Sequence, residues 1–305
     1  MHLDDRLLLI DRTPDRPARA LQRGAERGEL VRIAPGAYLK AAAWSTADSI
    51  ERHRLLMQAH AARHPGAIFT HRSAAIAHGL PMVKVPPRPE VLQPSSRRSS
   101  STPGVLRRTV RQVDEPLRIG MLLVVPLQRT LIDLAAALPL REALVPLDAH
   151  RRDGGQEHEL LELLGSRSLR GSRRAERSIA FADGRSANAG ESLSRGTMID
   201  LGFPLPDLQV AVSGLPYETD FAWPAHRRRG EFDGFAKYAD PRFTGTRAPA
   251  EVVVAEKRRE DAIRAATGDR FVRWTWNEAL AVHPLRRALL GAGLPQGRAL
   301  LRPQR

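Results

Sequence analysis

Apolar residues recur at helical spacing near the start of the chain and predict its first element. Ala18, Leu21 and Ala25 lie three and four residues apart, so they share one face of a helix that Gly28 ends. We expect two or three short helices of this kind within residues 1–40.

A strand-like pattern follows the helix. Residues 29–33 and 37–40 flank a turn at Ala34-Pro35-Gly36, which predicts a β-hairpin. A helix followed by a hairpin is the outline of a winged helix-turn-helix, and we place this domain at residues 1–45.

The middle of the chain predicts an α/β region over residues 46–165. A Pro- and Ser-rich stretch at 85–104 predicts irregular structure, and the basic segment 167–177 predicts a linker. The helices and strands expected between these points are helices at 49–63, 73–78, 128–138, 141–151 and 156–164, and strands at 105–113 and 120–125.

The last part of the chain, residues 175–305, alternates between helical and strand patterns. Together with the preceding regions this predicts a mixed α/β (α+β) fold. The elements expected here are helices at 191–201 and 251–267, and strands at 208–212, 217–223, 229–233 and 270–276.

Charge narrows the class of partner. The chain has 48 basic and 34 acidic residues, a formal net charge of +14, which favours a polyanion such as nucleic acid or an anionic membrane surface. An arginine-rich coding bias would explain the same surplus without a partner. Lysine is scarce, since it occurs only at positions 40, 84, 237 and 257.

Two absences exclude other classes. The chain has no cysteine, which excludes disulfides, thiolate metal sites and cysteine nucleophiles and fits a reducing cytoplasm. The most apolar stretch, residues 121–140, is interrupted by Pro126, Arg129, Asp133 and Pro139, so it does not predict a membrane span. We expect a soluble, cytoplasmic protein without a membrane partner.

Arginines line the N-terminal helix on a stripe beside its apolar face. This stripe and the hairpin are candidates for DNA binding, with the helix against the duplex and the hairpin arginine at a phosphate or in the minor groove. A solvated basic stripe without a ligand is the alternative. The candidate DNA-binding residues are Arg16, Arg19, Arg23 and Arg27 on the helix and Arg32 on the hairpin.

The strands at 217–223 and 229–233 form an acidic hairpin. If its turn is centred between Ala225 and His226, antiparallel pairing puts Asp220 opposite Glu231 and Glu218 opposite Asp233. The period of two then places all four carboxylates on one face, and Phe221 and Phe232 on the other, in the core.

Opposed carboxylates need a neutralising charge. Directly opposed side chains have Cβ atoms about 4.5–5.5 Å apart, where like charges repel. A divalent cation such as Mg²⁺ would offset this repulsion. The alternative is a solvent-exposed acidic hairpin neutralised by the adjacent arginines at 227, 228 and 229.

The ordered set of these motifs resembles the PD-(D/E)XK nuclease superfamily, particularly its branch related to very-short-patch-repair endonucleases. The resemblance covers about the last 130 residues. It implies a restriction-endonuclease-like α/β domain with a mixed central sheet. The residues that carry it are Asp220, the Glu231-Phe-Asp-Gly-Phe235 run, Glu256-Lys-Arg-Arg259, Arg273-Trp-Thr-Trp276, Glu191-Ser-Leu-Ser-Arg195 and Pro204-Leu-Pro-Asp-Leu-Gln209.

This resemblance implies roles for individual residues. Asp220 and Glu231 would hold Mg²⁺ or Mn²⁺, with Glu191 as a water-mediated ligand. Asp233 stands where the superfamily has a lysine. Lys257, or else Lys237, would have to supply that ammonium group, and without one the domain would bind metal or DNA and cut nothing.

The first 150 residues resemble AbiEi-type antitoxins, in which a winged helix-turn-helix precedes an α/β effector-binding region. The resemblance implies that the protein binds DNA and that its partner is a toxin protein encoded by the neighbouring gene. The matching stretches are Ala20–Gly24, Gly36–Leu39, Thr70–Ala75, Gly79–Pro81 and Pro126–Asp133.

Two functions follow from these resemblances. The first is a DNA-binding protein whose C-terminal domain is a metal-dependent endonuclease. The second is a non-enzymatic, antitoxin-like transcriptional autoregulator of a toxin–antitoxin or phage-defence locus, with an inactive nuclease-like domain. A third constellation, His71-Arg72-Ser73, lacks an acid partner, and Ser73 is expected to be a helix N-cap.

Overall fold

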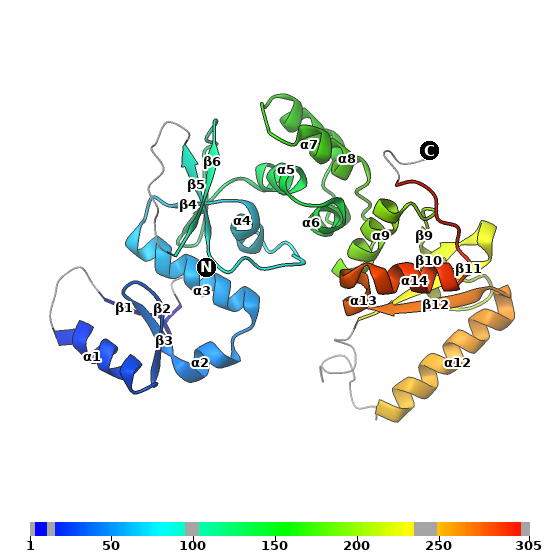
Figure 1. The fold of residues 1–305 in the computed structure, drawn as a ribbon, viewed down its shortest axis with the longest axis horizontal. Coiled ribbons are helices and arrows are strands. Elements are labelled where there is room, and N and C mark those ends of the chain that lie inside the picture. The colour runs from blue at the N-terminus through cyan, green and yellow to red at the C-terminus, as the bar shows by residue number, and fades with distance from the viewer. Residues whose placement is uncertain (1–3, 11–15, 95–103, 235–248, 300–305) are drawn as a thin grey trace. The chain divides into compact units, whose positions relative to one another are not determined.

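The computed structural model describes residues 4–10, 16–94, 104–234 and 249–299 (Figure 1). The chain divides into two compact units, Met1–Leu134 and Ala135–Arg305, here called the N-terminal and C-terminal units. Helices and three sheets are interspersed along the chain, so the predicted mixed α/β (α+β) class is confirmed. No described helix is both long and apolar enough to cross a membrane.

The N-terminal unit opens with a three-stranded sheet of order β1-β3-β2. The predicted helix and hairpin are confirmed. Of the two or three helices expected before the hairpin, the described residues contain one, because the apolar run before it pairs with β3 as strand β1. The elements are β1 (Leu8–Leu9), α1 (Arg16–Glu26), β2 (Leu30–Ala34), β3 (Ala37–Lys40) and α2 (Ala41–Thr46).

A five-stranded sheet of order β6-β5-β4-β8-β7 forms the rest of this unit. Its core contains Met57, Phe69, Leu122 and Val124. Part of the stretch expected to be irregular forms β5, which pairs with β4 and β6. The elements are α3 (Ser49–Arg63), β4 (Ile68–Phe69), α4 (His71–Ala77), β5 (Glu90–Pro94), β6 (Leu106–Val110), β7 (Leu117–Ile119) and β8 (Leu122–Val124). Helix α5 (Leu127–Ala137) begins in this unit and ends in the next.

The C-terminal unit contains a mixed four-stranded sheet of order β12-β11-β10-β9. Strand β10 pairs antiparallel with both β9 and β11, and β12 runs parallel to β11. All six elements predicted for residues 191–276 are present, as α9 (Ala189–Leu201), β9 (Asp207–Ala211), β10 (Glu218–Trp223), β11 (Arg228–Asp233), α12 (Pro249–Thr267) and β12 (Arg270–Thr275). A short 3-10 turn, η1 (Pro224–His226), joins β10 to β11, and α13 (Trp276–Ala281) and α14 (His283–Gly291) follow β12.

Three further helices belong to the C-terminal unit. Two of them were predicted to be part of the middle region, and the third lies where a linker was predicted at 167–177. They are α6 (Leu140–Arg152), α7 (Glu157–Gly165) and α8 (Ser172–Ala180). The physical reason is the close packing of α6 on α9. A Cβ atom on Gly196 would lie 2.5 Å from the Arg141 Cα atom, so the two helix backbones are nearly in contact.

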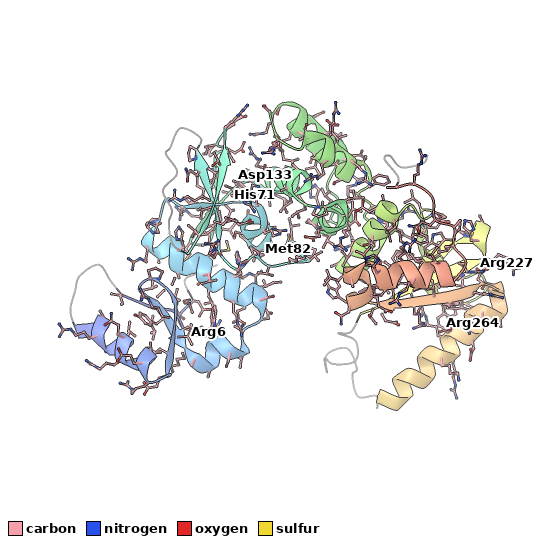
Figure 2. The ribbon with its side chains drawn as sticks, viewed as in Figure 1. Arg6, His71, Met82, Asp133, Arg227 and Arg264 are labelled. Carbon is pink, nitrogen blue, oxygen red and sulfur yellow. The ribbon has the colours of Figure 1, made fainter. Side chains whose placement is uncertain are left out.

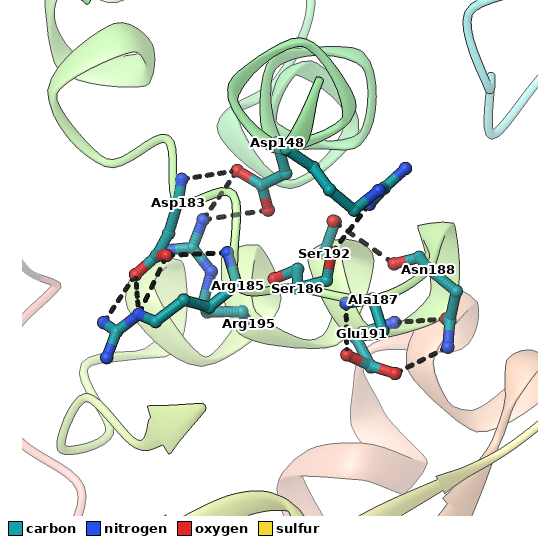
Figure 3. Close-up of polar contacts among 10 residues, drawn as sticks. Asp148, Asp183, Arg185, Ser186, Ala187, Asn188, Glu191, Ser192 and Arg195 are labelled. Carbon is teal, nitrogen blue, oxygen red and sulfur yellow. Dashed lines mark hydrogen bonds and ion pairs between the residues drawn. The ribbon is translucent and has the colours of Figure 1, made fainter. Parts of the chain in front are cut away.

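A buried ion pair fixes α6 to α9 (Figure 3). The Arg195 Nη2 atom donates to both carboxylate oxygens of Asp148, at 2.8 and 2.9 Å, and the backbone N–H of Asp183 donates to the Asp148 Oδ1 atom. The two side chains are 6% and 0% exposed. Burial raises the pKa of Asp148, and the Arg195 guanidinium opposes that rise.

Replacing Asp148 by Ala should destabilise the C-terminal unit strongly. The substitution leaves the Arg195 guanidinium buried without its carboxylate, and we expect a loss of about 3–5 kcal/mol in the free energy of unfolding. Urea denaturation measures this loss. Asp200→Ala is the matched control, because it breaks the partly exposed Arg177–Asp200 pair, for which the expected loss is below about 1 kcal/mol. Equal losses in the two variants would contradict the prediction.

Candidate functional site

The acidic hairpin pairs in the register predicted from its sequence. Phe221 lies opposite Gly230 in the β10–β11 ladder. Continuing this register by one step puts Asp220 across from Glu231. The Asp220 Oδ2 atom accepts a hydrogen bond from the backbone N–H of Phe232 at 2.8 Å, so this carboxylate is bound to strand β11.

The opposite face of the hairpin is aromatic and packs beneath α9. The Phe221 and Trp274 ring centroids are 5.2 Å apart, and the Trp274 Nε1 atom donates to the Ser194 Oγ atom of α9 at 2.7 Å. Phe232 lies close to the start of α9, since a Cβ atom on Gly190 would fall 2.0 Å from its ring. Phe221 and Phe232 are both buried, as predicted.

Two guanidinium groups neutralise the Glu231 carboxylate, which is 5% exposed. Arg273 lies directly opposite Glu231 in the parallel β11–β12 pairing, and its Nη2 atom is 2.8 Å from the Glu231 Oε2 atom. The Arg259 Nη1 atom, from α12, is 2.8 Å from Oε1 and 3.1 Å from Oε2. Both carboxylate oxygens therefore contact a cation.

The ion pairs extend along α12 and β12. The Arg273 guanidinium also contacts Asp233 Oδ1 at 3.2 Å and Glu260 Oε2 at 3.1 Å, and Glu260 in turn pairs with Arg264 at 2.5 Å. We call Arg259, Arg273, Arg264, Glu231, Asp233 and Glu260 the α12 ion network.

The neutralising charge comes from α12 and β12 and not from the hairpin turn. The arginines of that turn, Arg227, Arg228 and Arg229, were the predicted partners of the hairpin carboxylates. In the structure Arg229 pairs with Asp269 at 3.1 Å instead, and Arg227 Nε lies 3.9 Å from the same carboxylate.

Glu191 holds the start of α9 in place (Figure 3). Its side chain is 2% exposed. Its Oε2 atom accepts hydrogen bonds from the Ala187 backbone N–H at 2.7 Å and from Gln209 Nε2 at 2.9 Å, and its Oε1 atom accepts one from Asn188 Nδ2 at 2.6 Å. Asn188 is also the N-cap of this helix, so Glu191 joins the cap to strand β9.

Of the two lysines predicted to supply an ammonium group, the structure describes Lys257 and not Lys237. Lys237 lies outside the described residues. Lys257 is exposed on α12, and the contact from this helix to Glu231 comes from Arg259. Side chains two residues apart on a helix point in different directions, so Lys257 and Arg259 do not share a face.

The carboxylates were expected to bind Mg²⁺ or Mn²⁺, and their present hydrogen bonds oppose this. The oxygens of Glu231 contact arginines, those of Glu191 accept N–H groups, and Asp220 accepts a backbone N–H. Across the described ranges, no group of three His, Cys, Asp or Glu side chains is placed to hold a metal ion. The hairpin as folded therefore fits a divalent cation only if Arg259 and Arg273 are displaced.

The candidate DNA-binding arginines lie on α1 and β2. Arg19, Arg23 and Arg32 are exposed, and no hydrogen bond or ion pair joins them to another described residue. Arg27 is exposed too but pairs with Glu29 at 2.8 Å. The side chain of Arg16 lies outside the described residues.

The His71-Arg72-Ser73 constellation has a structural role. The N-cap of α4 is Thr70, and not Ser73 as predicted, because Ser73 lies inside the helix. The Ser73 Oγ atom accepts the Glu90 backbone N–H at 2.7 Å and lies 2.8 Å from the His53 Nε2 atom. The His53 Nδ1 atom faces the Pro86 carbonyl at 2.9 Å, so Nδ1 carries the proton and Ser73 donates to Nε2. Since Ser73 and His53 are 0% and 1% exposed, this pair is out of reach of a substrate.

Comparison with known proteins finds partial likenesses. No family model matches the chain. Two uncharacterized proteins of Mycobacterium tuberculosis, MT2308 of strain CDC 1551 and Rv2248 of strain H37Rv, are each 36% identical to it over 117 residues, which is 37% of this chain and 43% of the relative. The match therefore spans less than half of these relatives. The crystal structure of the RV2827C protein from the same organism aligns with a TM-score of 0.36 at 16% identity, over 59% of this chain and 69% of that chain.

Three histidines, the buried His53 and the partly buried His60 and His71, make the stability of the N-terminal unit depend on pH. Burial lowers the pKa of His53 and His71, and lowers that of His60 to about 4, with His64 and Arg107 adding to the effect. These rings stay neutral in the folded state, whereas the unfolded chain takes up protons near pH 6.5. Stability should be complete above about pH 6.5 and should fall as the pH drops toward 4.

Calorimetric unfolding of the full chain across this pH range measures the fall. His60→Gln should flatten it, because one titrating group is removed. His158→Gln, at an exposed position of the C-terminal unit, is the control and should leave the slope unchanged. A slope that His60→Gln does not alter would contradict the assignment.

Proposed function

We propose that the protein binds DNA through α1 and the β2–β3 hairpin. We further propose that it acts as a transcriptional regulator and does not hydrolyse DNA. The observation that carries DNA binding is the pair Arg19 and Arg23, exposed one helical turn apart and without a partner among the described residues. The hairpin that follows adds the exposed Arg32. A helix of this size fits the major groove, and arginines on it can contact phosphates or base edges.

We infer that the protein does not hydrolyse DNA because arginines already neutralise the Glu231 carboxylate. A metal-dependent nuclease needs carboxylate oxygens that can bind the cation. Here the cations at Glu231 are the guanidinium groups of Arg259 and Arg273. In addition, Asp233 occupies the position of the lysine expected in an active relative.

A regulator of this kind is the function that the resemblance to AbiEi-type antitoxins implies. We therefore propose a cytoplasmic autoregulator of a toxin–antitoxin or phage-defence locus, with a cognate toxin protein as its partner. The toxin gene should lie beside the gene of this protein. Co-expression and co-purification of the two products test this part.

Metal-dependent DNA hydrolysis is the second candidate function. The observation that favours it is the register of the β10–β11 hairpin, which brings Asp220 and Glu231 to neighbouring positions on adjacent strands. In that case Mg²⁺ or Mn²⁺ would bind at Asp220, Glu231 and Glu191 after the arginines move. Its chemistry would be polarisation of the scissile phosphate and activation of a water.

Replacing Arg19 and Arg23 together by Ala should weaken duplex DNA binding. Loss of two phosphate contacts should lower the slope of log K against log salt by about 2. Fluorescence anisotropy at several salt concentrations measures both effects. Arg88→Ala with Arg118→Ala is the matched control, because both are exposed arginines of the same unit. Equal weakening by the two pairs would mean that general charge, and not α1, binds DNA.

The purified full chain should leave supercoiled plasmid intact in Mg²⁺ and in Mn²⁺. Gel analysis of plasmid topology measures nicking, and calorimetric titration with Mn²⁺ measures metal binding without reference to activity. Nicking that Asp220→Asn and Glu231→Gln each abolish would overturn the non-hydrolytic proposal and establish the second candidate. Nicking that persists in both variants would point to a contaminating nuclease, and the wild-type sample would have to be repurified and found inactive.

A further inference from the structure

A second basic site lies in the C-terminal unit, at the junction of α12 and β12. A cavity of about 410 Å³, open to solvent, is lined by Arg264, Gly268, Asp269, Arg270 and Phe271. Figure 2 labels Arg264 and Arg227, which lie at this end of the sheet. We call this cavity the α12–β12 pocket.

The charge of the pocket is positive. Its one lining carboxylate, Asp269, already contacts Arg229 at 3.1 Å and Arg227 at 3.9 Å. Arg270 is exposed and has no ion pair with another described residue, and it lies beside Arg228 in the β11–β12 pairing. Arg264 pairs with Glu260 but remains 51% exposed. Arginines therefore outnumber carboxylates around the opening.

The C-terminal end of α12 disfavours anion binding in the pocket, and a guanidinium group offsets this effect. A helix C-terminus carries a partial negative charge. The Arg227 Nη2 atom donates to the carbonyls of Thr267 and Gly268 at 3.4 and 3.5 Å, so a guanidinium lies against this end of the helix. What remains for a ligand is the field of Arg264 and Arg270.

The pocket also contains a planar surface. The Arg264 guanidinium lies over the Phe271 ring, 5.7 Å from its centroid. Guanidinium and phenyl planes are the groups on which nucleic-acid bases stack, and arginines beside them contact the phosphates.

We propose that the α12–β12 pocket binds a phosphate of a single-stranded nucleic acid, with the neighbouring base against Arg264 and Phe271. A polymer fits better than a free nucleotide, because the arginines continue beyond the cavity along Arg227 and Arg228 of the hairpin. This site goes beyond the proposed function, which places duplex DNA on α1. It rests on neither Arg19 nor Arg23.

The test uses the full chain and a fluorescent single-stranded oligonucleotide, with anisotropy as the readout. All measurements are made in the Arg19→Ala/Arg23→Ala background, so that failure of α1 to bind DNA and failure of the pocket are distinguished. Arg264→Gln with Arg270→Gln should weaken binding about a hundredfold, the equivalent of two charge-assisted hydrogen bonds. The salt slope should fall by about 1.4, because two contacts to a single strand are lost.

Three further measurements complete the test. Arg170→Gln with Arg173→Gln, exposed beside the start of α8, is the matched control and should leave binding unchanged. Phe271→Leu should weaken the single strand more than the duplex, because only unpaired bases stack. Thermal unfolding shows that each variant is folded.

Unchanged oligonucleotide binding in the folded Arg264→Gln/Arg270→Gln variant would overturn the proposal. So would a loss of equal size in the control variant. Competition with a mononucleotide and with inorganic phosphate separates the sources of the anion. Competition by either one as strong as by the oligonucleotide would replace the single strand with that small anion as the ligand.

Discussion

The C-terminal sheet depends on the neutralisation of Glu231. A carboxylate removed from water is unfavourable unless a cation and hydrogen bonds compensate it. The parallel pairing of β11 with β12 puts Arg273 directly beside Glu231, and α12 brings Arg259 to the same oxygens. The crossover helix and the strand that it leads to thus bring the compensating charge with them.

This compensation changes the inference that close carboxylates require a metal. Repulsion between opposed acidic side chains demands a positive charge, but it does not decide which one. In the α12 ion network a single arginine, Arg273, contacts three carboxylates, those of Glu231, Asp233 and Glu260. A planar guanidinium with several donors can bridge carboxylates as a divalent cation would, and it is part of the folded chain.

Local patterns in the sequence predicted most of the C-terminal unit, including the hairpin register, because the position of a tight turn fixes the pairing of its strands. The role of Arg273 could not be predicted in this way, since it follows from parallel pairing across a long connection that includes α12. The resemblance implied Lys257 as the cation supplied by this helix, whereas Arg259 makes the contact with Glu231. Strand β1 was not predicted, because a two-residue strand has no recognisable period and is defined only by its pairing with β3.

The positive charge of the chain can attract a polyanion only where arginines are exposed and not paired with carboxylates. Arg195 is buried against Asp148 and is part of the packing of α6 on α9. Arg259 and Arg273 are matched by carboxylates in the α12 ion network. Exposed arginines with no carboxylate partner among the described residues include Arg19 and Arg23 of α1 and Arg270 of the α12–β12 pocket. Glu260 joins the pocket to the network, because it contacts both Arg264 and Arg273.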